Sequence, residues 1–382
     1  MLIRRCAILV FEAREHLEFD LATLFSGEQA LAADCRWVAL AAHLDAEVPV
    51  SDAELALLRS VGESLWVERE PLDRAHGQDT VDAMLQAGLL LAFEGAGAGW
   101  RERDEAVRES HWRPLPALAH AFSRWSGQDV ASDPRLSQFK TIRDMVQAFG
   151  PPPPETVERA PAAARIALPP PAAGPLDGPL MARYTGRNYD PAGVVPLAVA
   201  SRLLQRTFGA QQVREIAEGT AALKKTSPSG GSLHPIEAYV LVQRVEGLAP
   251  GFYHYHPVSH ALEPLQALAP PDARAHALAF VAGQDWFADA PLLVVMAPRW
   301  RRNFWKYRNH AKAHRAIMMD AGHLSQTFYL LAAEAGLPAF ITAAVNEIDI
   351  AQALGLDPVR DGVIAVCGCG PASGEQVTVE YR

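Results

Sequence analysis

The chain has 382 residues, of which 49% are hydrophobic and 21% charged. These values are ordinary for a globular protein with a core and leave room for two domains or one large one. No uninterrupted apolar run is long enough to cross a bilayer, which excludes a membrane-spanning helix and a membrane partner. The four cysteines, Cys6, Cys35, Cys367 and Cys369, are too few and too scattered for a disulfide framework. We therefore expect a cytoplasmic protein with reduced thiols.

The net charge is concentrated in the first part of the chain. Residues 1–150 hold 15 Lys and Arg against 24 Asp and Glu, whereas residues 151–382 hold 20 of each. The whole net charge of −9 therefore lies before residue 151. A region with this balance is a poor candidate for binding a phosphate backbone, so we expect no nucleic-acid partner.

The first 105 residues read as a small α+β unit. A first strand is expected over Ile8–Phe11, followed by a helix that the capping box of Ser51 and Glu54 opens. A short strand over Leu65–Val67 and a helix capped by Asp79 come next. Gly88 ends this helix before a strand over Leu89–Phe93. Helix, short strand, helix and apolar strand in this order are typical of a winged helix. The sequence predicts a winged-helix-like domain over residues 1–105.

A bridge and a linker follow. The stretch 107–127 is expected to be helical, and residues 151–179 contain ten prolines. Such a composition favours an extended, polyproline-like chain. We assign residues 106–176 to a helical bridge and a Pro-rich linker, and residues 177–382 to a second domain.

The second domain alternates helices and strands. Expected strands are 238–242, 251–256 (pairing with the first), 292–296, 362–368 and an edge strand over Val377–Tyr381. Pro196 is expected in the first turn of a helix that runs to Phe208, and Gly336 is expected to close a long helix that contains Ile317, Leu324 and Leu331. The 238–242 and 292–296 runs do not alternate, so these strands should be buried on both faces. The fold class is therefore α+β, with a mixed sheet flanked by helices.

One candidate ligand site is the segment Arg183-Tyr184-Thr185-Gly186-Arg187. In an extended backbone the side chains at 183, 185 and 187 point the same way. Two guanidinium groups around a hydroxyl suit a phosphate dianion. On its own the pattern is more often a solvated strand.

A second candidate is the loop from Lys225 to Pro235, which contains Pro228-Ser229-Gly230-Gly231-Ser232. The Gly pair lets the backbone approach a flat ligand, and the serines and N–H groups can bond the edge of a carbonyl-rich ring. Lys225 can place positive charge where a reduced flavin accumulates negative charge. The alternative is an ordinary Ser/Gly loop.

These segments, with Gly251-Phe252-Tyr253-His254-Tyr255, Lys306-Tyr307 and the run Asp320 to Gln326, resemble the SagB-type dehydrogenases of the nitroreductase superfamily, specifically the group described as peptide maturation dehydrogenases. The resemblance covers about residues 177–370. It implies an FMN-dependent nitroreductase fold, a homodimer, and the oxidation of a ribosomally made precursor peptide. The winged-helix-like domain resembles the elements that hold a leader peptide in such proteins. Other peptide-modifying enzymes are candidate partners.

By this resemblance Arg183, Thr185 and Arg187 bind the FMN phosphate, with Tyr184 between them. The flavin would be lined by Lys225, Pro228, Ser229, Gly230, Gly231 and Ser232, in part across a dimer interface. Ala343 and Ala344 fall where the superfamily has an acidic residue and a glycine whose backbone meets flavin N5, and Gly368 and Gly370 complete the set. The basic phosphate ligand that many nitroreductases carry after this point is missing from Pro371 to Gln376.

Oxidation of a peptide needs a base beside the flavin, and the Lys306-Tyr307 pair matches the pair assigned this role in the resembling enzymes. We expect Lys306 to be desolvated among Trp300, Phe304 and Trp305, with Tyr307 orienting the substrate or relaying the proton. The alternative interpretation is an ordinary surface pair on a basic helix, without a catalytic role. His310 and His314 are the alternative bases.

Other groupings carry less weight. His254, His256 and His260 have metal-like spacing, but alternate strand positions beside a turn are more often surface, so we expect no metal. Two further functions stay open: a general NAD(P)H-dependent nitro or quinone reductase, and a non-catalytic peptide-binding or regulatory protein with a degenerate flavin domain.

Overall fold

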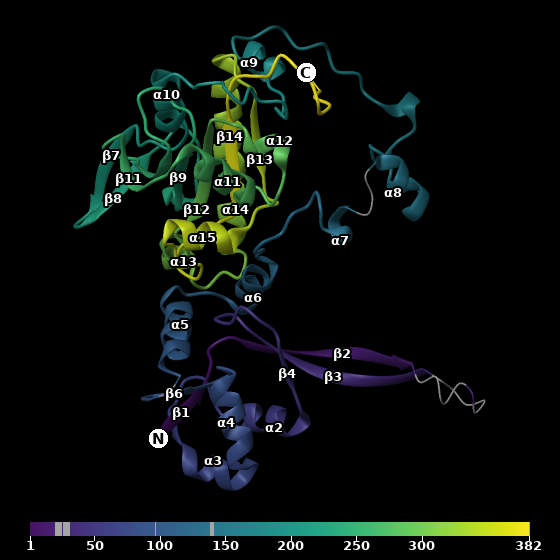
Figure 1. Ribbon diagram of the computed structural model, residues 1–382, viewed down its shortest axis with the longest axis vertical. Coiled ribbons are helices and arrows are strands. Elements are labelled where there is room, and N and C mark those ends of the chain that lie inside the picture. Colours follow the sequence, from purple (N-terminus) through teal and green to yellow (C-terminus); the bar gives the residue numbers. More distant parts are fainter. Residues whose placement is uncertain (20–24, 26–30, 96, 138–140, 382) are drawn as a thin grey trace.

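The computed structural model describes residues 1–19, 25, 31–95, 97–137 and 141–381. Residues 138–140 of the predicted bridge thus lie outside the described residues. Figure 1 shows an N-terminal region of small sheets and short helices beside a larger, helix-covered sheet, with an extended segment looping between them.

The N-terminal region has a core of its own. Strand β1 (Leu2–Arg5) pairs antiparallel with both β5 (Val67–Glu68) and β6 (Leu90–Ala92). Three helices accompany this sheet: α2 (Asp52–Ser60), α3 (Arg69–His76) and α4 (Gln78–Gln86). The shared core includes the fully buried residues Ile3, Leu57, Leu58, Val81 and Leu89.

The helix ends in this region test two sequence predictions. The capping box is confirmed, because the Ser51 side chain accepts from the Glu54 N–H and Glu54 bonds back to the Ser51 N–H. The predicted cap at Asp79 is wrong. Gly77 is the N-cap of α4 and makes no side-chain cap, and its φ of +88° favours glycine there. Asp79 lies in the first turn, where a carboxylate still favours the helix dipole.

A long hairpin projects from this region (Figure 1). Strand β2 (Leu9–Phe19) pairs along its whole length with β3 (Leu31–Ala41), and β4 (Val48–Val50) joins the base of β3. The strand predicted over Ile8–Phe11 is therefore only the start of β2. The outer part of the hairpin is exposed, so it lacks the alternation of apolar and polar residues by which a half-buried strand is recognised.

The bridge is helical and docked on the C-terminal region. Helix α5 (Ala98–Glu109) runs through residue 105, so the domain boundary predicted there falls inside a helix. Helix α6 (Pro114–Ser123) follows, and Trp112 Nε1 donates to Val359 O at 2.9 Å while His120 Nε2 lies 2.9 Å from Pro358 O. The backbone N–H of Trp125 donates to Glu347 Oε2 at 2.8 Å.

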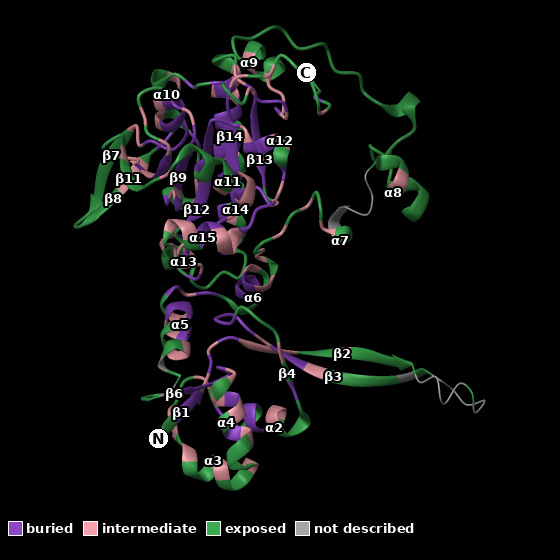
Figure 2. Ribbon diagram, viewed as in Figure 1, coloured by how far each residue is buried: buried purple, intermediate pink, exposed green. Residues whose placement is uncertain are grey.

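Between the bridge and the C-terminal region the chain is mostly exposed (Figure 2). It contains the short elements α7 (Pro134–Ser137), α8 (Ile142–Phe149), η1 (Ala162–Ala164) and α9 (Asp177–Ala182). Apart from η1, residues 150–176 have no regular structure and are exposed, as the prolines predict.

The C-terminal region is built on one six-stranded sheet. Its strand order is β11 (Ala261–Ala267), β10 (Gly251–His256), β9 (Ile236–Val242), β12 (Leu292–Pro298), β14 (Ala365–Cys369) and β13 (Ala339–Thr342). The predicted pairing of 251–256 with 238–242 is confirmed. The predicted mixed sheet is wrong, because every described strand pair in this sheet is antiparallel. A single parallel bridge, between Thr185 and Ala339, is added at its β13 edge.

Helices cover both faces of this sheet. On one face, Val240 and Val294 pack with α10 (Leu197–Thr207) and α14 (Ala313–Glu334). On the other face, Leu241 and Leu293 pack with α11 (Pro270–Phe280) and α15 (Glu347–Leu354). Successive strand residues thus enter opposite cores, which confirms that β9 and β12 are buried on both faces.

The remaining elements lie at the edges. They are the exposed hairpin of β7 (Gln212–Ala217) and β8 (Thr220–Lys224), η2 (Gly230–Ser232), α12 (Asp285–Ala288) and α13 (Trp300–Tyr307). Pro196 is the N-cap of α10 rather than a residue of its first turn. Gly336 follows the end of α14 with φ +72°, close to the predicted stop.

The predicted edge strand over Val377–Tyr381 is wrong. This segment is irregular and is held by side chains instead, with the N–H groups of Val377 and Thr378 donating to Asn188 Oδ1 at 2.8 and 2.7 Å.

Within the described part of the chain, no helix is both long and apolar enough to cross a membrane. In the same residues no group of three or more His, Cys, Asp or Glu side chains is placed to hold a metal ion.

Candidate functional site

The predicted phosphate segment lies against the C-terminal half of α14. The Thr185 hydroxyl is 3.1 Å from the Tyr329 hydroxyl, and the Arg183 guanidinium lies over the Tyr329 ring at 5.3 Å. The Gly186 N–H donates to Ala339 O at 2.9 Å, which fixes the segment as an extended strand at the sheet edge. Arg183, Tyr184, Thr185 and Arg187 are all partly exposed. The extended backbone that the array requires is therefore present.

The predicted Gly/Ser loop lies against the first half of the same helix. Asp320 accepts hydrogen bonds from the Ser229 hydroxyl and from the Gly230 N–H, the latter at 3.1 Å. Ser227 Oγ is 2.7 Å from Thr327 Oγ1. Asp320 is buried, so its two bonds anchor the loop to the helix.

Helix α14 sets the spacing between these two segments. Asp320 and Tyr329 are nine residues apart, which at 1.5 Å per residue is roughly 13 Å along the axis. Strand β13 gives a similar span, because Thr185 bridges Ala339 at its start and Ala343 follows its end, roughly 13 Å further on. The phosphate segment lies at one end of an elongated surface, and the loop and Ala343 lie at the other.

Lys225 is buried at the base of the loop. Burial, assisted by Arg299 and Arg302, lowers the pKa of Lys225 to about 8, although Glu237 opposes this change. A small cavity beside it is lined by Lys225, Pro228, Ser229 and Asp320. The site thus contains a buried amine with a lowered pKa that lines a cavity at the loop.

The loop backbone is closely approached by Lys306 and Tyr307. A Cβ at Gly231 would lie 2.6 Å from the Tyr307 hydroxyl and 2.7 Å from Lys306 Nζ, and the φ of Gly231 is +63°. The positive φ favours glycine, and a side chain at this position would displace the ends of Lys306 and Tyr307 from the loop. Ser232 follows with φ +58° and donates to Leu223 O at 3.3 Å.

The predicted surroundings of Lys306 are only half right. Trp300 and Phe304 are buried, but Trp305 is 57% exposed and Lys306 itself is exposed. The reason is that they lie on different faces of α13, so the tryptophan at 305 does not cover the amine. The expected desolvation of Lys306 is not provided by this chain's own residues.

Ala343 and Ala344 differ from each other in their backbone bonding. The Ala344 N–H donates to Thr342 Oγ1 at 3.1 Å, and Ala344 O accepts from Gln284 at 2.8 Å. The Ala343 N–H makes no hydrogen bond to any described residue. Of the two predicted backbone donors, Ala343 is therefore the one left for a ligand.

Gly368 in strand β14 and Gly370 just after its end have a packing role. A Cβ at Gly368 would lie 2.3 Å from the Phe340 ring, and one at Gly370 would lie 2.1 Å from Pro291. Both positions thus require glycine for the sheet interior. Their predicted contact with the cofactor stays a prediction.

The C-terminal segment brings a carboxylate to the backbone of the phosphate segment. Glu380 Oε1 accepts from the N–H groups of Arg187 and Asn188 at 2.6 and 2.9 Å. The phosphate segment is thus held by Glu380 on one side and by Tyr329 on the other. Sequence reasoning missed Asp320, Tyr329 and Glu380, although a buried aspartate within the apolar stripe of α14 was a signal for the first.

The histidines of the 254–260 group are each engaged separately. His254 lies between Glu237 and Glu263, at 3.3 and 2.7 Å, and these carboxylates raise its pKa. His256 bonds Ser259, and His260 bonds Ser201 and Tyr255. Hydrogen bonding accounts for all three.

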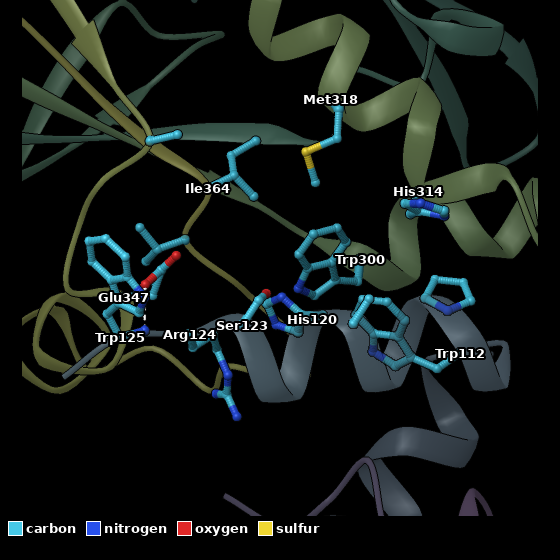
Figure 3. Close-up of a pocket in the computed structure, with 14 residues that line it drawn as sticks. Trp112, His120, Ser123, Arg124, Trp125, Trp300, His314, Met318, Glu347 and Ile364 are labelled. Carbon is cyan, nitrogen blue, oxygen red and sulfur yellow. Dashed lines mark hydrogen bonds between the residues drawn. The ribbon is translucent and has the colours of Figure 1, made fainter. Parts of the chain in front are cut away.

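Figure 3 shows a cavity of about 390 Å³ between the bridge and the C-terminal region. Trp112, His120 and Trp125 come from the bridge, whereas Trp300, Met318 and Ala343 come from the C-terminal region. The cavity therefore reaches the end of β13 where the flavin-facing backbone is predicted. No motif in the sequence indicated it, because its walls come from segments about 200 residues apart.

Comparison with known proteins identifies the family to which this fold belongs. The family model described as the nitroreductase family matches residues 180–370, half of the chain. The chain belongs to the nitroreductase family. This confirms the resemblance read from Arg183–Arg187, the Gly/Ser loop and the following strands.

Three relatives match the same region. A protein of Methanocaldococcus jannaschii named as a nitroreductase, MJ1384, is 28% identical over 180 residues, covering 47% of this chain and 83% of that protein. The trifolitoxin-processing protein TfxB of Rhizobium leguminosarum bv. trifolii is 29% identical, covering 37% of this chain and 38% of TfxB. The microcin B17-processing protein McbC of Escherichia coli is 25% identical, covering 45% and 61%. The matched region thus spans 38% of TfxB and 61% of McbC, less than two thirds of either processing protein.

A solved structure, the E. coli microcin synthetase McbBCD complex with truncated pro-MccB17 bound, contains a chain that is 20% identical with a TM-score of 0.44, covering 65% of this chain and 89% of that one. This likeness is too distant to bear on function.

Proposed function

We propose that this protein is an FMN-dependent dehydrogenase of the SagB type that acts in the maturation of a ribosomally synthesised peptide. The observation that carries the proposal is the meeting of Lys306 and Tyr307 at Gly231, in the loop that the family resemblance assigns to the flavin. The two relatives named for processing a peptide toxin support a peptide substrate.

The residues present suit FMN. Members of the nitroreductase family typically bind it. Arg183, Thr185 and Arg187 offer two cations and a hydroxyl to the phosphate, and Tyr329 and Glu380 hold their backbone and side chains in place. At the other end of α14, Asp320 holds the Ser229–Gly231 loop through the Gly230 N–H, the exposed Gly231 is the part of the loop that a flat ring would meet, and the buried amine of Lys225 lies at the base of the same loop.

Bound FMN supplies N5 as a hydride acceptor. Oxidising a C–C or C–N single bond to a double bond removes a hydride, which bound FMN would accept, and a proton from the neighbouring atom. Lys306 is proposed to take this proton and Tyr307 to orient the substrate or relay the proton. An external oxidant such as dioxygen would be needed to take up the two electrons.

Exposure of Lys306 has a consequence for this role. A base that is open to water in one chain becomes desolvated when another surface covers it. We propose that a second copy of the chain and the bound peptide cover Lys306, as expected for a homodimer whose flavin is lined in part across the interface.

The N-terminal region is proposed to recognise the peptide. The proposed division is a winged-helix-like unit over residues 1–105, a bridge and linker over 106–176 and the FMN domain over 177–382; helices α2, α3 and α4 with the sheet β5-β1-β6 support the first of these, whereas the hairpin β2-β3 with β4 is an addition to it. The charge of the N-terminal region favours peptide over DNA. Fluorescence polarisation of the full chain with the precursor peptide and with duplex DNA should show binding of the peptide alone, and the reverse result would contradict this part.

Two other functions fit the family. A general NAD(P)H-dependent nitro or quinone reductase needs no acidic N-terminal region, and a non-catalytic peptide-binding protein needs no Lys306 at the loop. The peptide dehydrogenase is the function that uses both the acidic N-terminal region and Lys306 at the loop.

The experiment that tests the proposal is flavin analysis of the purified chain. The wild type should be yellow and release FMN on denaturation. Arg183→Ala with Arg187→Ala should be folded and colourless, because each charge-assisted contact contributes roughly 1.5–3 kcal/mol. Arg202→Ala, which removes only an exposed pair with Glu334, is the control and should keep its flavin. Stoichiometric FMN in the double variant would overturn the assignment.

A further inference from the structure

The turn that follows β13 is held by two buried amide side chains. It spans residues 342–346 and leads from the end of β13 to the start of α15. The amides belong to Gln284, which is 7% exposed, and to Asn346, which is 2% exposed. Ala343 is exposed, whereas the other residues of the turn are buried or half-buried. A ligand that reaches this turn therefore meets Ala343 first.

Gln284 forms a closed set of hydrogen bonds with the turn. Its Nε2 donates to Ala344 O at 2.8 Å and to Val281 O at 2.7 Å. Because a carbonyl oxygen only accepts, these contacts fix which way the amide points. The Thr342 hydroxyl lies 3.1 Å from Nε2 and donates to Gln284 Oε1 at 3.3 Å, and it accepts the Ala344 N–H at 3.1 Å. Gln284 thus holds the carbonyl of Ala344 directly and its N–H through Thr342.

These bonds determine the direction of a free N–H group. Thr342 is the last residue of β13 and is paired with Val366, and Ala344 is fixed by the Gln284 bonds. The backbone on both sides of Ala343 is therefore fixed. The Ala343 N–H lies between these fixed parts and makes no hydrogen bond to any described residue. An unbonded donor whose direction is set before a ligand arrives is preorganised to bind an acceptor.

Asn346 ties the other end of the turn to the same surroundings. Its Nδ2 donates to Ala279 O at 2.8 Å, at the C-terminal end of α11, which Gln284 also contacts. It also exchanges two hydrogen bonds with the backbone of Gln128, at 2.9 and 3.0 Å. The bridge continues this contact through Trp125, whose N–H donates to Glu347 at 2.8 Å (Figure 3). Helix α11 and the bridge together form a rigid support for the turn.

We propose that Gln284 is a positioning residue, which acts through Thr342 and Ala344 to direct the Ala343 N–H at N5 of bound FMN. This inference rests on the proposed function for its cofactor. Ala343 and Ala344 carry no polar side chain, so the backbone is what this turn offers to a ligand. If Gln284 had a structural role alone, its loss would weaken the binding of any flavin equally.

The test compares FMN with 5-deaza-FMN, in which a C–H group replaces N5 and removes the acceptor. Calorimetric titration of the full chain, freed of its flavin, measures both affinities. Wild type should bind FMN about fivefold more tightly than 5-deaza-FMN, the effect of one hydrogen bond. Gln284→Met has a side chain of similar length without the amide, and its ratio of the two affinities should fall to about one.

Gln243→Met is the matched control. Gln243 is also buried, and its Nε2 donates to Ala288 O and Ala290 O, each at 2.7 Å, in the segment before β12. Its loss should destabilise the fold in a comparable way and leave the fivefold preference for FMN unchanged. A preference that Gln284→Met retains, or that Gln243→Met also loses, would overturn the positioning role.

A second pair of variants tests the same contact without changing Gln284. Thr342→Val keeps the shape of the side chain and removes the hydroxyl that accepts from Ala344, so the preference for FMN should be lost. Thr342→Ser keeps the hydroxyl and should keep the preference. This pair decides the question if Gln284→Met does not fold. Equal preferences in the two Thr342 variants would contradict the proposal.

Wild type separates this inference from the proposed function. A wild type that prefers FMN to 5-deaza-FMN but oxidises no peptide would contradict the proposed function and leave the role of Gln284 standing. A wild type that oxidises peptide but binds the two flavins equally would overturn the role of Gln284 alone. A wild type that binds neither flavin would overturn both.

Discussion

Single residues explain most of the electrostatics of the site. Lys225 is buried and His120 is half-buried, and in each case desolvation lowers the pKa and so favours the neutral form, whereas Lys306 is exposed. The difference follows from position: Lys225 lies under the loop and His120 under Trp112, whereas Lys306 lies on the outer side of α13.

His120 gives the protein an acid-sensitive bridge. Its folded pKa of about 4 lies below the ordinary 6.5, so the unfolded chain takes up a proton first as pH falls. The free energy of unfolding should therefore decrease between pH 6.5 and pH 4, by at most about 3 kcal/mol from this group. Urea unfolding across this range should show that the free energies of unfolding of wild type and His120→Phe approach each other as the pH falls. The exposed His310→Phe variant should follow wild type. A difference between wild type and His120→Phe that is independent of pH would contradict the burial of a neutral His120.

Lys306 and Tyr307 should affect turnover and not flavin content. Lys306→Ala and Tyr307→Phe should each keep FMN, because neither supplies the phosphate contacts, and lose peptide oxidation by roughly 10²-fold or more, as for loss of a general base. Arg308→Ala, on the same exposed end of α13, is the control. Unchanged turnover in Lys306→Ala would transfer the role to His310 or to His314, which lines the aromatic cavity.

At the scale of elements, α14 organises the site. Its buried stripe packs on the sheet, and two polar residues of the same helix, Asp320 and Tyr329, hold the loop and the phosphate segment about 13 Å apart. A rigid helix fixes this spacing better than either loop alone.

Removal of the Asp320 carboxylate should release the loop. Asp320→Ala leaves the Gly230 N–H and the Ser229 hydroxyl without their acceptor, so unfolding should become easier by about 1–3 kcal/mol and FMN affinity should fall. Glu334→Ala, which breaks a solvent-exposed pair on the same helix, should change stability by less than about 0.5 kcal/mol. Thermal unfolding and flavin titration measure both, and equal effects of the two variants would show that Asp320 is no anchor.

The sequence predicted the elements that carry strong local signals. The capping box at Ser51, the unalternating strands around Val240 and Val294, and the length of α14 all follow from short-range pattern. It did not predict β3, whose outer half is exposed and has no apolar face, nor the irregular run to Tyr381, which side-chain bonds to Asn188 hold.

The residues of the candidate site also differ in whether a short-range pattern in the sequence predicts them. Arg183, Thr185, Lys225 and Gly231 lie in motifs that can be read locally. The anchors Tyr329 and Glu380 and the aromatic cavity depend on contacts between distant segments, and no local pattern encodes them, whereas Asp320 stood out as an aspartate within the apolar stripe of α14.

At the scale of the whole molecule, the N-terminal region and the nitroreductase region are connected parts. The bridge is docked on the nitroreductase region through Trp112, His120 and Trp125, and a long exposed linker follows it in the chain. If the proposed function holds, this arrangement suits a long, flexible substrate that is held at one place and oxidised at another.

The most direct test of the central claim is a single turnover without oxygen. The purified, FMN-loaded full chain is mixed anaerobically with its precursor peptide, and the visible flavin absorbance and the peptide mass are followed together. The proposed function predicts that the flavin bleaches once, that an equal amount of peptide loses two hydrogen atoms, and that NAD(P)H is not required. Flavin bleached by NAD(P)H but never by peptide would contradict it and favour a general reductase.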